Sequence, residues 1–351
     1  MPEEKMPFID FRSDTITWPT AKMRQAMAEA QVGDDVYEED PTVIKLEKLS
    51  AERMGKEAGL FVPSGTMGNL VAVLTHCGRG DEVILGDISH TFIYEAGGIS
   101  ALGGVFPHTL PNQPDGRLRL EDIRSAIRTD NVHFPKTRLV ILENTHNRCG
   151  GAVLDEDYTR QVADIAHQAG FPLHLDGARI FNAATALGVD VKTLALPADS
   201  ITFCLSKALC APVGSVVCGS AEFIARARRI RKQVGGGMRQ AGILAAAGII
   251  AIEEMVDHLA DDHRRARQLA EGLGVIPGLI LDAGLPPTNM VYVSLAEDFP
   301  LNSSAIAQTI EKQGIRVGVI NPRRFRLVTH YWINDEAVKK VIAAFQQVMQ
   351  T

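Results

Sequence analysis

From about residue 60 to residue 220, short apolar runs rich in β-branched residues alternate with stretches whose apolar residues lie three or four positions apart. The first pattern suits a strand buried on both faces, and the second suits a helix that covers a sheet. Their alternation is typical of a doubly wound α/β fold. We therefore predict a mostly parallel seven-stranded sheet sandwiched by helices. The strands are expected at 59–62, 82–85, 105–109, 138–142, 172–175, 200–204 and 213–218, and helices at 66–76, 155–169 and 178–186.

The segments outside this core complete the predicted domain organisation. Residues 1–20 form an extended arm that ends near Pro19, because proline suits the first turn of a helix. Residues 21–250 form the large domain, which also holds a helix at 41–54. Two long helical patterns lead to a Pro/Gly-rich break at 277–287. Residues 251–351 are predicted to form a smaller α+β domain, with strands at 290–295, 316–319 and 325–329 and helices at 303–313 and 335–349.

Composition excludes several classes of protein. Apolar residues make up 46% and charged residues 22% of the chain, which suits a globular fold, and the net charge of -6 gives no broad basic field for nucleic acid. The longest apolar run, 241–252, is too short to span a membrane and predicts a buried helix. The five cysteines are odd in number and lack metal-type spacing, so we expect buried thiols and no metal. No secretory signal is visible, and we therefore expect a cytoplasmic location.

Two reactive groups follow neighbouring predicted strands. Asp176 ends the apolar run 172–175, and Lys207 follows the strand 200–204 among apolar residues. Ligands of open α/β sheets bind outside the carboxyl ends of the strands. A carboxylate there can face a protonated pyridine nitrogen, and a partly desolvated amine can form an imine with an aldehyde. Alone, the aspartate reads as a helix cap and the lysine as a solvated side chain, but their proximity favours a pyridoxal-phosphate site.

Three weaker signals agree with this interpretation. Ser64, Gly65 and Thr66 join a strand to a helix and offer backbone N–H groups for a phosphate, although the same residues are a common helix cap. His90 follows the next strand, where it could lie on a planar ring or be a core histidine. Arg326 lies in an apolar strand, where a substrate carboxylate or an internal acid would pair with it.

Together these motifs resemble the threonine aldolases of the low-specificity L or L-allo type, within the fold-type I, aspartate-aminotransferase-like superfamily. The resemblance extends from about residue 9 to residue 330. It predicts the fold-type I large domain, pyridoxal 5'-phosphate as cofactor, and an arm that contributes to the active site. The segments that carry it are Arg12–Thr15, Val32–Tyr37, Glu39–Thr42, Ser64–Thr66, Leu142–Asn147, His174–Arg179, Leu205–Lys207 and Gly235–Gln240.

The resemblance also implies a role for each site residue. Lys207 would hold the cofactor as a Schiff base, Asp176 would contact the pyridine nitrogen, His90 would stack on the ring, and Ser64, Gly65 and Thr66 would hold the phosphate. Arg179 would contact both the cofactor and the substrate carboxylate, which Ser13 and Arg326 would also bind, while Tyr37 and His133 would lie near the β-hydroxyl. Arg239 would reach the phosphate of a neighbouring subunit in a homotetramer built from dimers.

The expected reaction is retro-aldol cleavage of L-threonine, L-allo-threonine or a related β-hydroxy-α-amino acid to glycine and an aldehyde. His90, His133 or a water between them would act as the base. The rival functions are transamination or β-elimination on the same scaffold, and a catalytically silent cofactor-binding protein. The chain departs from the family pattern at Glu38, where a glycine is common, at Ile44, where asparagine is frequent, and at Ala208 and Cys210, where the lysine loop usually has glycines.

Overall fold

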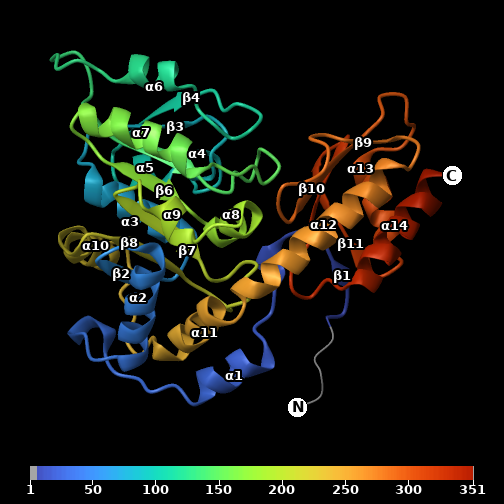
Figure 1. The fold of residues 1–351 in the computed structure, drawn as a ribbon, viewed down its shortest axis with the longest axis horizontal. Coiled ribbons are helices and arrows are strands. Elements are labelled where there is room, and N and C mark those ends of the chain that lie inside the picture. Colours follow the sequence, from blue (N-terminus) through green and yellow to red (C-terminus); the bar gives the residue numbers. More distant parts are fainter. Residues whose placement is uncertain (1–5, 351) are drawn as a thin grey trace.

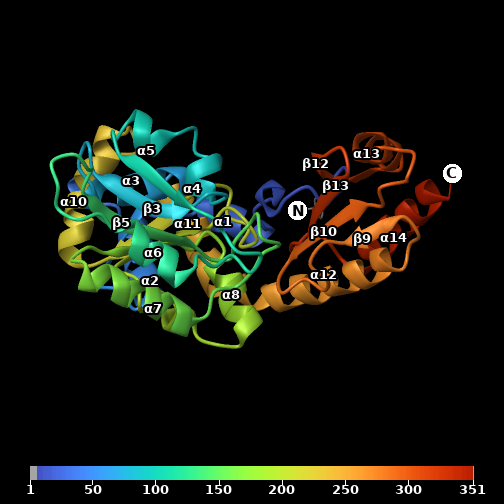
Figure 2. The same cartoon turned by 90° about the horizontal axis from the view of Figure 1, so that it is seen from above.

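The computed structural model describes residues 6–350 as a larger and a smaller lobe joined by the long helix α12 (Leu259–Gly274) (Figures 1 and 2). The largest apolar core lies in the larger lobe and includes residues from Met23 to Leu259. A second core fills the smaller lobe and combines residues 266–348 with Phe11 from the arm. None of the helices in residues 6–350 has the length and apolar character needed to cross a bilayer.

The larger lobe is built on a seven-stranded sheet of order β2-β8-β7-β6-β5-β3-β4. The sheet is parallel except for β8, which runs antiparallel to both of its neighbours. The central strands are apolar and buried on both faces, as the sequence pattern predicts. Its strands are β2 (Ala58–Val62), β3 (Glu82–Gly86), β4 (Phe106–Leu110), β5 (Thr137–Glu143), β6 (Leu173–Asp176), β7 (Ser200–Cys204) and β8 (Ser215–Gly219).

Helices cover both faces of this sheet. On one face α3 (Gly65–His76) packs on β7 and β8, beside α5 (Gly98–Ala101) and α10 (Ala221–Gln233). On the other face α2 packs on β2 and β8, and α7 packs on β5 and β6. The remaining helices of this lobe surround these layers. They are α1 (Ala21–Ala28), α2 (Pro41–Met54), α4 (His90–Ile93), α6 (Leu120–Ala126), α7 (Glu156–Gln168), α8 (Ile180–Leu187), α9 (Val191–Ala195) and α11 (Gly242–Glu253), with short 3-10 turns η1 (Asp14–Ile16), η2 (Asp35–Tyr37) and η3 (Val256–His258).

The smaller lobe packs helices against an antiparallel sheet of order β12-β13-β10-β9. Helix α12 contacts β9 and β10, and α14 packs on both α12 and α13. Its strands are β9 (Leu279–Leu281), β10 (Met290–Leu295), β11 (Ile315–Arg316), β12 (Gly318–Asn321) and β13 (Arg324–Val328), and its other helices are α13 (Ser303–Glu311) and α14 (Asp335–Met349).

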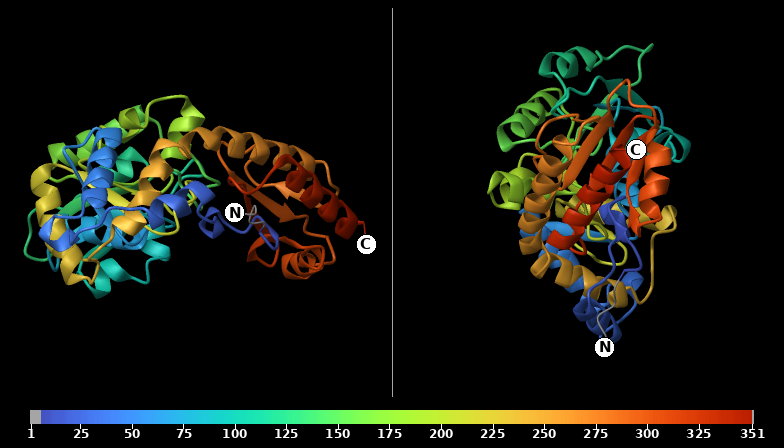
Figure 3. Two further views of the ribbon diagram at one scale, coloured as in Figure 1. Left: turned by 90° about the horizontal axis from the view of Figure 1, so that it is seen from below. Right: turned by 90° about the vertical axis from the view of Figure 1, so that its right-hand side faces the viewer.

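The amino-terminal arm connects the two lobes (Figure 3). Strand β1 (Ile9–Asp10) pairs in parallel with β11, and Phe11 lies in the core of the smaller lobe. A few residues later, the Thr17 hydroxyl donates a hydrogen bond of 2.8 Å to the backbone oxygen of Lys207 in the larger lobe. The arm therefore contacts both lobes within nine residues.

The predicted fold class is confirmed, with a few differences in detail. Three helices, α10, α11 and α12, replace the two long helical patterns expected after residue 220. The glycines at 235–237 separate α10 from α11, and η3 separates α11 from α12. Strand β9 lies inside the predicted break at 277–287, and the short helices α4, α5, α6 and α9 were not expected. All five cysteines are free, but Cys149 is partly exposed rather than buried.

Candidate active site

The carboxyl ends of four neighbouring strands bring the main predicted groups together. Lys207 lies three residues after β7, Asp176 ends β6, Glu143 ends β5, and His90 follows β3. The charge of Lys207 acts on His90, and so does the charge of Asp176. Among residues 6–350, the Lys207 ammonium makes no hydrogen bond or ion pair, so its amine is available for reaction.

A buried amide and a second carboxylate surround Asp176. Asn69, on α3, donates from Nδ2 to Asp176 Oδ2 at 2.8 Å and to Glu95 Oε1 at 2.8 Å. The same Glu95 oxygen lies 2.9 Å from Nδ1 of His90. Burial lowers the pKa of His90, but the hydrogen bond to Glu95 and the charge of Asp176 outweigh it, so the net pKa is raised. Glu95 therefore orients His90 and favours its charged form.

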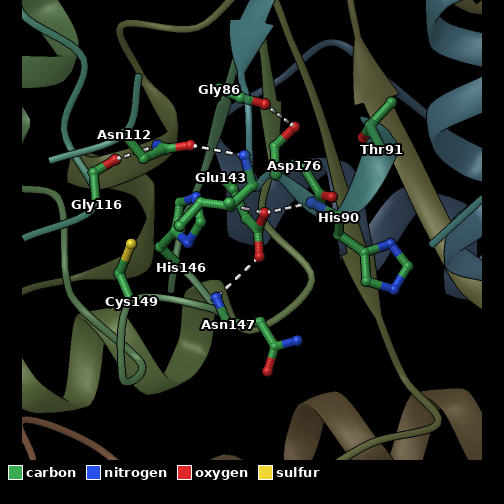
Figure 4. Close-up of polar contacts among 12 residues, drawn as sticks. Gly86, His90, Thr91, Asn112, Gly116, Glu143, His146, Asn147, Cys149 and Asp176 are labelled. Carbon is green, nitrogen blue, oxygen red and sulfur yellow. Dashed lines mark hydrogen bonds and ion pairs between the residues drawn. The ribbon is translucent and has the colours of Figure 1, made fainter. Parts of the chain in front are cut away.

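Glu143 links the His90 segment to the substrate side of the site (Figure 4). Its two carboxylate oxygens accept hydrogen bonds from the backbone N–H groups of His90, at 2.7 Å, and Asn147, at 2.9 Å. The Asn147 side chain in turn accepts a hydrogen bond of 2.9 Å from Nη1 of Arg326. Arg326 Nη2 donates to the backbone oxygen of Arg12, next to Ser13. Arg326 therefore contacts the backbone of the residue before Ser13.

Arg179 has a partner that the sequence did not predict. It donates from Nε and Nη2 to the two carboxylate oxygens of Asp14, at 2.7 and 2.6 Å, and both residues are buried. Burial raises the pKa of Asp14, but the charge and hydrogen bonds of Arg179 outweigh it and hold that pKa far below its usual value. Asp14 engages Nε and Nη2 of Arg179, and Nη1 has no partner among residues 6–350, so a substrate carboxylate could bind Arg179 only through the N–H groups that Asp14 leaves free.

The predicted phosphate cradle lies at the N-terminus of α3. Ser64 caps the helix by accepting a hydrogen bond from the Met67 N–H, while the N–H groups of Gly65 and Thr66 have no acceptor among the described residues. These groups are free for an anion. A Cβ atom at Gly65 would lie 2.8 Å from the Cys204 sulfur, so this position requires glycine.

Three predicted residues lie away from Lys207. His133 is exposed in the loop before β5, at the amino edge of the sheet, opposite to the edge that carries Lys207. Tyr37 is 73% exposed, and it shares the 34–38 turn with Asp34, whose carboxylate pairs with Arg239 at 3.1 Å. The adjoining Gly236 packs against Met67 of α3. Among residues 6–350 of one chain, none of these three residues forms a hydrogen bond or ion pair with Lys207, Asp176, Glu143 or His90.

Two departures from the family pattern carry backbone strain. Glu38 has φ of 59° and Cys210 has φ of 64°, both in the left-handed region that favours glycine. Glu38 follows Tyr37, and Cys210 lies three residues after Lys207. The structure thus keeps a glycine-type backbone at both positions although the side chains differ.

The site fits pyridoxal phosphate on grounds of charge. Asp176 is 2% exposed, yet it forms no ion pair within residues 6–350. It accepts hydrogen bonds from Asn69 Nδ2 and from the Ala178 N–H, both neutral donors, and a protonated pyridine nitrogen would supply the positive charge that these donors do not. The free N–H groups of Gly65 and Thr66 and the unpaired amine of Lys207 complement the phosphate and aldehyde of the same molecule.

Comparisons with known proteins identify the family to which the chain belongs. A family model described as Beta-eliminating lyase matches residues 10–296. Low-specificity L-threonine aldolase 1 from Arabidopsis thaliana is 48% identical over 99% of this chain and 98% of its own length. Low specificity L-threonine aldolase from Escherichia coli K12 is 44% identical over 95% of this chain and 97% of its own.

Solved structures share the fold. Threonine aldolase from Leishmania major superposes with a TM-score of 0.82 at 23% identity, covering 97% of this chain and 99% of that one. Sphingomonas wittichii serine palmitoyltransferase has the same fold, with a TM-score of 0.77 at 18% identity, covering 98% of this chain and 87% of that one. From the family model and the close relatives, this chain belongs to the beta-eliminating lyase family and, within it, to the threonine aldolases.

Proposed function

We propose that this chain is a pyridoxal-phosphate-dependent carbon-carbon lyase that cleaves L-threonine, L-allo-threonine and related β-hydroxy-α-amino acids to glycine and an aldehyde. The observation that carries the proposal is the position of Lys207 and Asp176 at the ends of adjacent strands, each without an ionic partner among the described residues. Relatives named low-specificity L-threonine aldolases, 44–48% identical over nearly the whole chain, support the choice of reaction.

Bound pyridoxal phosphate supplies an aldehyde for an amine and a ring that accepts the electron pair of a broken Cα bond. Lys207 is the covalent anchor, and Asp176 holds a proton on the pyridine nitrogen. The N–H groups of Gly65 and Thr66, with the Ser64 hydroxyl, hold the phosphate at the positive end of α3. His90, held by Glu95, packs on the ring.

Arg326 and Ser13 are proposed to bind the substrate carboxylate. Arg326 is fixed by Asn147 and by the Arg12 backbone, and its buried Nε atom has no partner in the described chain. A carboxylate would satisfy that donor. By fixing the carboxylate, Arg326 and Ser13 would orient the substrate and so select which bond at Cα is broken. Arg179 supports this region through Asp14.

Cleavage requires a base that removes the β-hydroxyl proton, and glycine forms when Cα gains a proton. We propose His90 in its neutral form, His133 or a water between them as the base. His133 can take this role only if a second copy of the chain brings it to the site, since it lies at the opposite sheet edge of its own chain. The proposed contact between Arg239 and a phosphate also requires a second copy of the chain. We therefore propose a homotetramer of two dimers, with sites shared between subunits. We also propose that the protein is located in the cytoplasm.

The test is to incubate the purified protein, loaded with cofactor, separately with L-threonine and L-allo-threonine. Glycine and acetaldehyde are expected in equal amounts. A keto acid with ammonia would instead indicate β-elimination, and a keto acid with aminated cofactor would indicate transamination. No turnover of any β-hydroxy amino acid by fully loaded protein would favour a silent binding protein.

Lys207→Ala provides the control for the anchor. The visible absorbance of the cofactor bound to lysine should disappear in this variant, while the variant remains folded by circular dichroism. Persistence of that absorbance would show that another amine holds the cofactor.

A further inference from the structure

A line of hydrogen bonds leads away from Asp176, through the layer between α3 and the sheet. Asn69 Nδ2 lies 2.8 Å from Asp176 Oδ2, and Asn69 Oδ1 lies 3.4 Å from Nε2 of His174. His174 Nδ1 lies 2.8 Å from the Ser200 hydroxyl, which lies 2.8 Å from Nε2 of His76. The line therefore runs from the carboxyl edge of the sheet to its amino edge.

The fold explains why these residues meet. His174 and Asp176 are two residues apart on β6 and so share one face of the sheet, and His174 pairs directly with Ser200 of β7. Asn69 and His76 are seven residues apart on α3 and so share the helix face that packs on β7. Four of the five residues are at least nine-tenths buried, and His76 at the far end is partly exposed.

The direction of the hydrogen bonds in this line is assigned outward from the Asp176 carboxylate. The Asn69 amide turns its N–H group to that carboxylate, so its oxygen faces His174 and can only accept. Nε2 of His174, which also lies 3.5 Å from the Thr202 hydroxyl, is therefore assigned the proton, and its bare Nδ1 accepts from Ser200. The Ser200 oxygen, having donated its only hydrogen, accepts from Nε2–H of His76. Every donor in the line therefore points toward Asp176.

We propose that His174 is a positioning residue for the cofactor. Its Nε2–H group holds the Asn69 amide in the orientation that donates to Asp176, and this bond keeps the Asp176 carboxylate ionised and directed at the pyridine nitrogen. This inference rests on the proposed function, because it needs a cofactor with a protonated ring nitrogen. A chain of aligned hydrogen bonds polarises its members and strengthens the last bond, which here ends on the carboxylate.

Burial supports the required neutral state of both rings. It lowers the pKa of His174 to about 3, and, with a contribution from His174, it lowers the pKa of His76 to about 3. A charged His174 would donate from both nitrogens and would leave Ser200 Oγ without its acceptor. Near neutral pH each ring is therefore a single donor and a single acceptor, as the line requires.

Two matched variants separate positioning from mere packing. In His174→Gln, the terminal amide N–H occupies the place of Nε2 and can still donate to Asn69. In His174→Asn, the shorter amide reaches only the place of Nδ1, beside Ser200. Both variants remove the ring, and they differ by one buried methylene, so a purely structural role would change the affinity only in step with the difference in stability measured by urea unfolding.

The readout is the dissociation constant for pyridoxal phosphate, measured by spectroscopic titration of cofactor-free protein, with urea unfolding as the folding control. We expect His174→Gln to bind within about twofold of the wild type and His174→Asn to bind about five- to tenfold more weakly. Equal affinities for the two variants would overturn the proposal. Failure of the wild-type protein to bind the cofactor would instead overturn the proposed function.

A second measurement needs no variant and no cofactor. In protein labelled with 15N-histidine, His174 and His76 should both show the neutral Nε2–H form between pH 6 and pH 8, as the donor direction requires. A His174 ring protonated on Nδ1 would contradict the direction of the whole line, whatever the activity of the enzyme.

Discussion

The buried ion pair between Asp14 and Arg179 allows a quantitative test of how the arm is held. Asp14→Asn preserves the shape of the side chain but removes its charge, and it leaves a buried guanidinium without a counter-ion. Breaking a buried pair by removing one partner destabilises a protein by about 3–5 kcal/mol. We therefore expect a loss of this size in the free energy of unfolding.

The expected loss can be converted into a shift in melting temperature. Unfolding entropy near 60 °C is about 2.1 cal/mol/K per residue, or about 0.7 kcal/mol/K for a chain of this length if it unfolds as one unit. The melting temperature of Asp14→Asn should then fall by about 4–7 °C. The double variant Asp14→Asn/Arg179→Met should recover part of this loss, because it removes the unpaired cation as well.

Urea unfolding is the suitable assay, followed by both circular dichroism and tryptophan fluorescence. Only two tryptophans are present, and Nε1 of Trp332 donates to the backbone oxygen of Trp18 in the arm, so fluorescence reports on the arm itself. Coincident transitions by the two probes would justify a two-state treatment.

The control is Glu254→Gln, which breaks the exposed pair between Glu254 and Lys22. Exposed pairs contribute about 0–1 kcal/mol. If Asp14→Asn lost no more stability than this control, the reasoning about the buried pair would be wrong.

The lowered pKa of Asp14 also allows a test by pH. The stabilising effect of Asp14 is fully present above about pH 4 and is lost as the pH falls further. The free energies of unfolding of the wild type and Asp14→Asn should therefore become equal in acid.

Three further predictions concern other groups. Burial raises the pKa of Asp262 to about 8, so the folded state binds the proton more tightly than the unfolded state. Ionisation of Asp262 therefore lowers the free energy of unfolding as the pH rises from about 4 to 8. Asp262→Asn should be more stable than wild type in urea at about pH 8.5, with a smaller gain at about pH 5. Tyr158→Phe removes the hydroxyl that bonds both the N–H and the oxygen of Leu118, and we expect a loss of about 1–3 kcal/mol in urea unfolding; no measurable loss would mean that water replaces the hydroxyl. Glu38→Gly should be about 1 kcal/mol more stable than Glu38→Ala, since both lose the carboxylate but only glycine relieves the left-handed backbone; equal stabilities would argue against strain at this position.

Periodicity predicted most of the larger lobe because its signal is local. A strand buried on both faces is rich in apolar and β-branched residues, and β7 was predicted with its bounds correct although it also buries Ser200 and Thr202. The short helices α4 and α5 have four residues each, too few for any periodic pattern to emerge. Strand β9 was missed because its pairing with β10, and not its own sequence beside Pro277 and Gly278, decides its conformation.

The site was predicted where a residue type is informative by itself. Lys207 and Asp176 follow strands, and the topology rule for open sheets brings strand ends together. Asn69 and Asp14 were missed because their importance depends on partners 26 to 165 residues away. Glu95 was missed although its partner His90 lies only five residues before it. One signal was available in the sequence. His174 and Asp176 lie two residues apart on an otherwise apolar strand, so their side chains share one face of the sheet, and buried polar side chains require hydrogen-bond partners on the helix that covers that face.

The arm also determines the order in which the molecule can be completed during synthesis. Ile9 pairs with Ile315, so β1 leaves the ribosome about 300 residues before its partner, a delay of about 15–60 s at ordinary elongation rates. The seven-stranded sheet is complete by Gly219, so Lys207 and Arg179 are in place long before β11 exists. During that interval Phe11 has no core to enter, and the arm is held only from the side of the larger lobe. From the completion of the sheet at Gly219 until β11 is made, about a quarter of the chain length, one side of the proposed site is still missing.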